Sequence, residues 1–185
     1  MRKFLLTLLI AVPAFVVAQD ATVPTKFEWT KDKGLTDYIV VPLEGKTAAK
    51  MYTEVFGWMV DRSDLKIIKK VDDEFVVVEG RTTELFCSNV MGSANCEPVI
   101  YTFEMSFKDG KYKFDVTSMK WDEKSSNMLI PIEIAPPFTS NYYNKKGEIR
   151  NAYKWISDSL PNFMDKLSAD FKERFSTRTG PKNDW

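Results

Sequence analysis

Two short motifs combine residue types that enzymes use for catalysis or for phosphate binding. Gly45-Lys46-Thr47 has the ending of a phosphate-binding loop, but the earlier glycine that such a loop requires would fall at Val40. Ser63 and Lys66 have the nucleophile-and-base spacing of exported penicillin-recognising enzymes, yet neither Ser-Asp-Asn nor Lys-Thr-Gly follows them. We therefore interpret the first motif as a turn with a helix cap and the second as a solvated turn.

Paired acids are the remaining candidates for acid–base chemistry. Asp72-Asp73, Asp122-Glu123 and Glu133 could supply two carboxylates for glycoside hydrolysis, but adjacent acids in turns diverge and stay hydrated. Their spacing is also unlike that of a calcium-binding loop. The chain contains no histidine, the commonest general base and metal ligand. We therefore predict a protein that is not an enzyme, with no catalytic residue, metal or cofactor, and keep a hydrolase as the remotest alternative.

The N-terminus has the pattern of an export signal. Arg2 and Lys3 precede an apolar run over residues 4–17, which is too short to span a bilayer comfortably, and Ala18 ends a small-residue cleavage site. We predict that residues 1–18 are a signal peptide and that no transmembrane segment remains after cleavage. The mature chain is then expected to be periplasmic or secreted.

The composition of the mature chain bears on its partners and on its cysteines. Loss of Arg2 and Lys3 with the signal reduces the 26 basic side chains to 24 against 26 acidic ones, a net charge of −2. Such a chain lacks the basic field that binds phosphate backbones, so we expect no nucleic-acid partner. An oxidising compartment favours a structural disulfide between Cys87 and Cys96, with two free thiols as the main alternative.

Period and turn signals divide the mature chain into four segments. Residues 19–34 are polar without a period and are expected to be a flexible leader, whereas residues 35–122 indicate a folded α+β domain. Residues 123–147 hold three prolines and are expected to be a connector. Residues 148–180 are predicted to form a C-terminal helix that packs on the sheet, kinked or split at Pro161.

Within the domain, apolar alternation and turn residues predict most of the strands. The expected elements are a strand over residues 38–43, a helix over residues 51–59 with Thr47 as its N-cap, a hairpin of residues 65–71 and 74–79 around Asp72-Asp73, and a less distinct strand over residues 85–90. The predicted fold class is α+β, with a curved antiparallel sheet of about five or six strands packed by an N-terminal helix and a long C-terminal helix.

The clearest local signal lies in residues 99–121, where Asp109-Gly110 separates two alternating runs and predicts a type I′ turn. With Lys108 opposite Lys111, the large apolar residues fall on one face of the hairpin. The expected pairs are Phe107 with Tyr112, Met105 with Phe114, and Phe103 with Val116. A change of parity after Thr117-Ser118 predicts a β-bulge or the end of the strand.

Several of these motifs recur together in a known family. Residues 41–47 lead into Met51-Tyr52, the helix closes at Gly57-Trp58, and residues 99–103 are followed by residues 108–113. Over residues 35–121 this order resembles domain of unknown function 4468, a family of exported Bacteroidetes proteins with a TATA-binding-protein-like (TBP-like) fold. The resemblance implies a curved antiparallel sheet backed by helices, and no chemistry. Export and the net charge argue against DNA binding by such a sheet.

One apolar face of the hairpin is the best candidate for function. Such a face is normally a filled core, but a bent sheet and a long helix could instead enclose a cavity for an apolar ligand. The candidate ligand contacts are Phe103, Met105, Phe107, Phe114, Phe163, Leu167 and Phe171. We therefore predict an exported, non-enzymatic binding module, foremost a carrier of a small hydrophobic ligand. The alternative is a protein–protein interaction or structural module that binds a cell-envelope protein.

Overall fold

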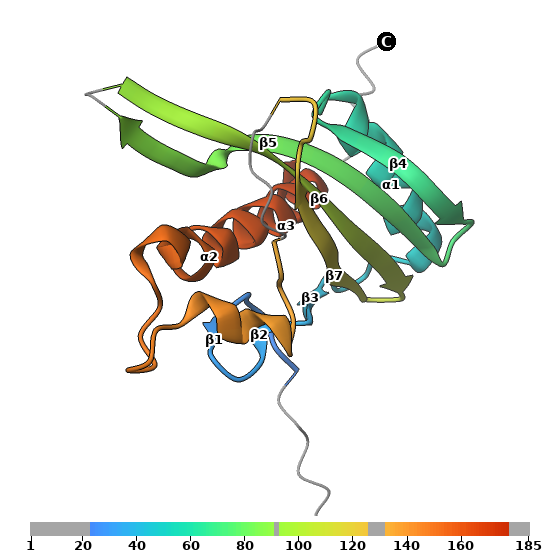
Figure 1. Cartoon of the computed structure of the whole chain (residues 1–185). Helices are drawn as coiled ribbons and strands as arrows, with labels where there is room; N and C mark the ends of the chain where they lie inside the picture. The colour runs from blue at the N-terminus through green and yellow to red at the C-terminus, as the bar shows by residue number, and fades with distance from the viewer. Residues whose placement is uncertain (1–22, 91–92, 126–131, 178–185) are drawn as a thin grey trace, which may run out of the picture.

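A computed structural model describes residues 23–90, 93–125 and 132–177 (Figure 1). The predicted signal peptide, residues 19–22 of the predicted leader and residues 178–180 of the predicted last helix lie outside the described residues. The elements in chain order are β1 (Trp29–Thr30), β2 (Gly34–Leu35), β3 (Tyr38–Pro42), α1 (Ala48–Val60), β4 (Leu65–Val71), β5 (Phe75–Val90), β6 (Ser93–Lys108), β7 (Lys111–Trp121), the 3-10 helices η1 (Phe138–Tyr142) and η2 (Asn151–Tyr153), α2 (Lys154–Asp158) and α3 (Leu160–Thr177).

A five-stranded antiparallel sheet with the order β3-β7-β6-β5-β4 forms the centre of the fold. The sheet is curved, and α1 and α3 lie against the same face of it (Figure 1). Trp58 of α1 contacts both Phe171 of α3 and Phe103 of β6, so one core joins the sheet and both helices. The predicted α+β fold class is confirmed.

The β6–β7 hairpin has the predicted register. Lys108 faces Lys111 across the turn, and the three predicted apolar pairs are present. The predicted turn type is wrong, because a type I′ turn needs positive φ at both central residues, and here Gly110 has it, at 78°, whereas Asp109 does not. The predicted bulge is also present, because Phe103 pairs with Val116 while Thr102 pairs with Ser118. The strand then continues to Trp121.

The N-terminal end of helix α1 is hydrogen-bonded to the turn of this hairpin. Thr47 is its N-cap as predicted, since its side chain accepts a hydrogen bond from the Lys50 amide at 3.2 Å. The Ala48 amide donates to the Asp109 carboxylate at 2.9 Å, and the Gly110 amide donates to the Lys46 carbonyl at 2.8 Å. The chain between β3 and α1 is therefore held by a turn some sixty residues away.

Strand β5 is longer than the sequence predicts. The expected strands over residues 74–79 and 85–90 are one strand, whose register with β6 shifts between Thr82 and Phe86. That irregularity breaks the alternation of side chains, which is why the pattern indicates two strands. The predicted disulfide is confirmed, because Cys87 is bonded to Cys96 directly opposite on β6.

The predicted leader and connector are both part of the folded domain in their described portions. Residues 29–35 form the β1–β2 hairpin, and Phe27 is buried against the sheet, where its ring meets Phe114 edge-on. Ile132 and Tyr142 of the connector are buried as well. Single apolar anchors produce no period, so pattern analysis does not detect them.

The C-terminal helix begins later than predicted and is divided near Pro161. Residues 148–150 are not helical; η2 and α2 follow, and α3 starts at Leu160. Pro161 occupies the first turn of α3, where its missing N–H costs nothing and its fixed φ suits the helix. Among the described residues, no helix is long and apolar enough to cross a membrane.

Candidate functional site

The predicted ligand contacts belong to one core on the face of the sheet that α1 and α3 cover, and Phe107 meets Tyr52 of α1. Phe163 is half-buried and the other six are buried, namely Phe103, Met105, Phe107, Phe114, Leu167 and Phe171. Phe103 stacks on Phe114 with ring centroids 4.5 Å apart and planes 14° apart. Phe171 packs edge-on against Tyr112 at 5.2 Å. Such contacts are those of a close-packed core, and a ligand role for these residues stays a prediction.

Two tyrosine hydroxyl groups are buried in this core. The Tyr112 hydroxyl lies 2.8 Å from the carbonyl oxygen of Ser168, to which it donates, and 3.0 Å from the Ser168 hydroxyl. The Tyr101 hydroxyl has no hydrogen-bond partner within the described residues, and its ring covers Gly80, where a Cβ atom would collide with it. Burial raises the pKa of both tyrosines, so both stay protonated at neutral pH.

A groove of about 380 Å³ runs along the outside of this core, between the edge strand β3, helix α3 and the segment before β1. Its apolar lining comes from Ile39 and Val41 of β3, which are buried, and from Ala169 of α3, which is exposed. Two backbone hydrogen bonds hold the N-terminal wall in place. The Val40 amide donates to the Pro24 carbonyl at 2.9 Å, and the Phe27 amide donates to the Asp165 carboxylate at 2.9 Å.

Four charged side chains line the same groove. Lys26, Lys166 and Lys172 are exposed, whereas Asp165 is half-buried. Desolvation raises the pKa of Asp165, opposed by the hydrogen bond from the Phe27 amide and by the nearby Lys26. The residues on α3 share one helix face, because 165, 168, 169 and 172 are three or four positions apart.

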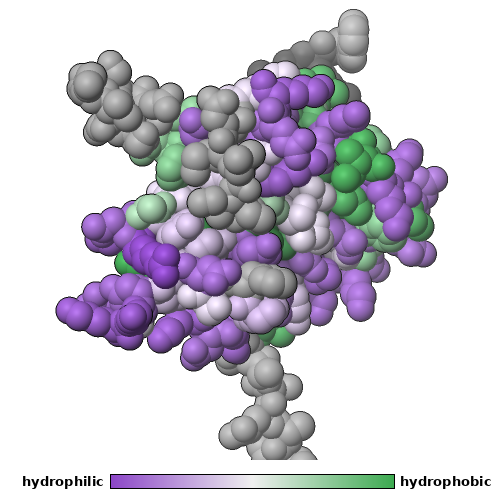
Figure 2. Space-filling model, viewed as in Figure 1, coloured by the Kyte–Doolittle hydropathy of each residue, from purple (hydrophilic) through white to green (hydrophobic). Residues whose placement is uncertain are grey.

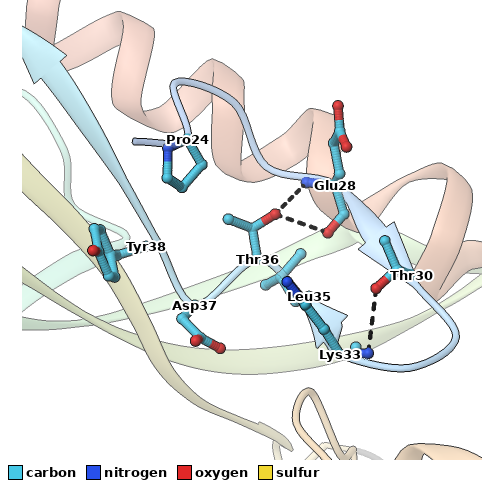
Figure 3. A pocket seen from close by; sticks show the side chains of 9 residues that line it. Pro24, Glu28, Thr30, Lys33, Leu35, Thr36, Asp37 and Tyr38 are labelled. Carbon is cyan, nitrogen blue, oxygen red and sulfur yellow. Dashed lines mark hydrogen bonds between the residues drawn. The ribbon is translucent and has the colours of Figure 1, made fainter. Parts of the chain in front are cut away.

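A second hollow, of about 370 Å³, lies beside the β1–β2 hairpin (Figure 3). Its hydroxyl groups are engaged within the hairpin. The Thr36 side chain accepts from the Glu28 amide at 2.9 Å and donates to the Glu28 carbonyl at 3.1 Å. The Thr30 hydroxyl accepts from the Lys33 amide at 3.3 Å. These groups stabilise the turn, and the charged side chains that line the hollow are those of Glu28, Lys33 and Asp37.

A third hollow, of about 320 Å³, lies where the end of α1 meets α3. Arg62 binds both oxygens of Asp64, at 2.9 and 2.8 Å, and reaches Asp170 at 2.6 Å. The Trp58 indole also donates to Asp170, at 2.9 Å. The hydrogen bonds with Arg62 lower the pKa of Asp64.

The second arginine of the third hollow makes similar contacts. Arg174 of α3 lies 3.4 Å from Glu54 and 3.0 Å from Asp61, both in or just after α1. The charged groups of this hollow therefore bind one another and join the two helices.

The motifs singled out in the sequence have structural roles. The amides at the start of α1 are satisfied by Thr47 and Asp109, so Gly45-Lys46-Thr47 is a turn and cap, as interpreted. Asp122 differs from expectation, because it is buried and pairs with Arg81 at 2.7 Å, which lowers its pKa. Within residues 23–90, 93–125 and 132–177, no group of three or more acidic or cysteine side chains could hold a metal ion.

Sequence reasoning missed the groove. Its lining comes from three segments, residues 25–26, 39–41 and 165–172, that are far apart in the chain. The spacing of 165, 168, 169 and 172 marks one face of a helix, but that face mixes charged and small residues and so lacks an apolar signal.

Comparison with known proteins identifies the fold. No family model and no curated protein matches the sequence. The structure is similar to the crystal structure of a DUF4468 family protein from Bacteroides ovatus ATCC 8483, with a TM-score of 0.57 and 14% identity, covering 80% of this chain and 90% of that chain. It is also similar to a TBP-like protein from Parabacteroides distasonis ATCC 8503, with a TM-score of 0.51 and 10% identity, covering 76% and 91%. The chain thus has the DUF4468/TBP-like fold that its sequence resembles.

Proposed function

We propose that this protein is an exported, non-enzymatic binding module that takes up a small hydrophobic ligand in the groove between β3 and α3. The observation that carries the proposal is the groove itself, which combines an apolar lining of Ile39, Val41 and Ala169 with about 380 Å³ of space. That volume lies within the range of about 300–1,000 Å³ that is usual for small-molecule sites.

The packing of the interior supports a site outside it. A ligand between β6 and α3 would have to displace rings such as Phe103 and Phe114, whose centroids are 4.5 Å apart. Opening such a contact removes dispersion and hydrophobic stabilisation of the domain. The groove needs no such rearrangement, because its space already exists beside the core.

The state of the polar groups supports a role in binding rather than catalysis. A general acid or base must be held near a reacting atom and be free to exchange its proton. In the other two hollows, the hydroxyls of Thr30 and Thr36 and the charges of Arg62 and Arg174 are already used in structural contacts. The groove contributes one half-buried carboxylate, Asp165, which accepts a backbone hydrogen bond.

Export is supported by the N-terminal pattern and by the Cys87–Cys96 disulfide, which is compatible with an oxidising compartment. N-terminal sequencing of protein recovered from the periplasm or the medium tests it. We expect the mature chain to begin at Gln19, and an uncut chain in the cytoplasm would refute export.

Filling the groove tests the binding site. Ala169 is exposed on α3, so Ala169→Trp should leave the fold intact while its indole occupies the groove. We expect this variant to lose binding of the neutral fluorescent probe N-phenylnaphthylamine. The matched control is Ala49→Trp, because Ala49 is exposed on α1 outside the groove. Equal probe binding by both variants would refute the groove as the site.

A second candidate function is binding of a cell-envelope protein, and the sheet edge at β4 favours it. Ile68 and Val71 are 49% and 37% exposed, and hydrophobic side chains gather at the right of Figure 2, where Figure 1 places the β4–β5 hairpin. Covalent cross-linking from position 68 in intact cells tests this role. One recurrent envelope protein that is lost in Ile68→Lys would support it, and the absence of cross-links would refute it.

A further inference from the structure

We infer that the groove between β3 and α3 selects a hydrophobic ligand with an anionic head group, which Lys172 binds and which the positive charges of Lys26 and Lys166 attract. The inference rests on the proposed function of this groove and adds the chemical class of its ligand. It depends on the charges that line the groove and on their freedom to meet a ligand.

The groove differs in charge from the other two hollows. Three lysines and one aspartate line it, which gives a net charge of +2 when Asp165 is ionised. The hollow beside β1–β2 is lined by Glu28, Lys33 and Asp37, and the hollow between α1 and α3 by three acids and two arginines, so each has a net charge of −1. A concave site of one sign concentrates ligands of the opposite sign.

Within residues 23–90, 93–125 and 132–177, none of the three lysines forms an ion pair, although Lys26 lies near enough to Asp165 to lower the pKa of that carboxyl. The basic residues that form ion pairs in the described ranges are Arg62, Lys70, Arg81, Lys113 and Arg174. Lys26, Lys166 and Lys172 are exposed, and each has a long aliphatic stem that can cover an apolar chain while its ammonium group contacts the head group.

Along α3, Lys172 lies at some distance from the acidic Asp165. Asp165 and Lys172 are seven residues apart, which is about 10 Å along a helix axis at 1.5 Å per residue. Ala169 lies between them on the helix and lines the groove together with Ile39 and Val41 of β3. An apolar chain that lies over Ala169 can therefore place its anionic group at Lys172, away from the Asp165 carboxylate, which is held by the Phe27 amide.

Three probes with the same ten-carbon chain test the inference: decanoate, decanol and decyltrimethylammonium. Calorimetric titration of the mature protein at low ionic strength should give decanoate an affinity about tenfold higher than decanol, with the cation weakest. Added salt should reduce the preference for decanoate, because exposed charges are screened.

Substitutions of charged residues show which side chains cause the preference for decanoate over decanol. Lys172→Glu should weaken decanoate about five- to tenfold and leave decanol unchanged, because reversal replaces an attraction with a repulsion. Asp165→Asn keeps an acceptor for the Phe27 amide and should strengthen decanoate about two- to threefold. Lys66→Glu is the control, since Lys66 is exposed on β4, at the opposite edge of the sheet.

The outcomes separate this inference from the proposed function. Equal affinities for decanoate and decanol, a preference for the cation, or equal effects of Lys172→Glu and Lys66→Glu would overturn the inference while hydrophobic binding stands. Failure of all three probes to bind would overturn the proposed function and the inference together.

Discussion

One side of α3 is buried in the core, whereas the adjacent side lines a groove at the surface. Met164 and Phe171 on one side are fully buried against the sheet, while Asp165, Ala169 and Lys172 on the adjacent side line an open groove. Neighbouring positions of one helix thus belong to two regions, a packed interior and a surface site. Stability and ligand binding should therefore be separable by substitutions one residue apart, which a site inside the core would not permit.

The largest expected effect comes from opening the interior. Phe114 is fully buried between Phe103 and Phe27, so Phe114→Ala should lower the free energy of unfolding by about 3–5 kcal/mol through lost burial and the cavity left behind. Urea denaturation measures this loss. A cost below about 1 kcal/mol would mean that the interior already contains space, and would restore the core as a ligand site.

A smaller effect is expected at the hydrogen bonds that join Tyr112 of β7 to Ser168 of α3. Tyr112→Phe removes the hydrogen bonds that the Tyr112 hydroxyl makes with the carbonyl and the hydroxyl of Ser168. We expect unfolding to become easier by about 1–2 kcal/mol, with probe binding in the groove unchanged. Thermal unfolding and a probe titration on the same sample check both parts. Loss of probe binding would show that the two regions are coupled.

The smallest effect is expected in the groove, and it depends on pH. Because desolvation raises the pKa of Asp165 in the folded chain, its ionised form costs stability above that pKa, and the cost disappears as pH falls toward the ordinary value of 3.8. Asp165→Asn should therefore be stabilising at neutral pH, within about 0.5 kcal/mol, and the gain should vanish in acid. Urea midpoints of both proteins across this range measure it. A gain that grows in acid would contradict the assigned cause.

Much of the fold could be predicted because its signals are local. The register of the β6–β7 hairpin follows from Asp109-Gly110 and from strict alternation on either side, and α1 follows from Thr47 and its apolar period. The sequence pattern does not predict the burial of Phe27 and Tyr142, since a single apolar residue in a polar segment has no period. Their burial depends on tertiary contacts.

The candidate site could be predicted only in part. Pattern analysis places the seven apolar residues on one apolar face, and they belong to one core, but whether that core is filled depends on how rings such as Phe103 and Phe114 pack. The groove is lined by residues as far apart in the chain as Lys26 and Lys172, which are separated by 146 positions. No local pattern predicts that such residues line one groove.

An NMR titration of the mature protein with N-phenylnaphthylamine tests the central claim most directly, because it reports on both regions at once. The groove site predicts shifts of the backbone amides of Val41, Ala169 and Lys172, with those of Phe103 and Met105 on β6 unchanged. Shifts centred on Phe103 and Met105 would contradict it and assign the ligand to the interior.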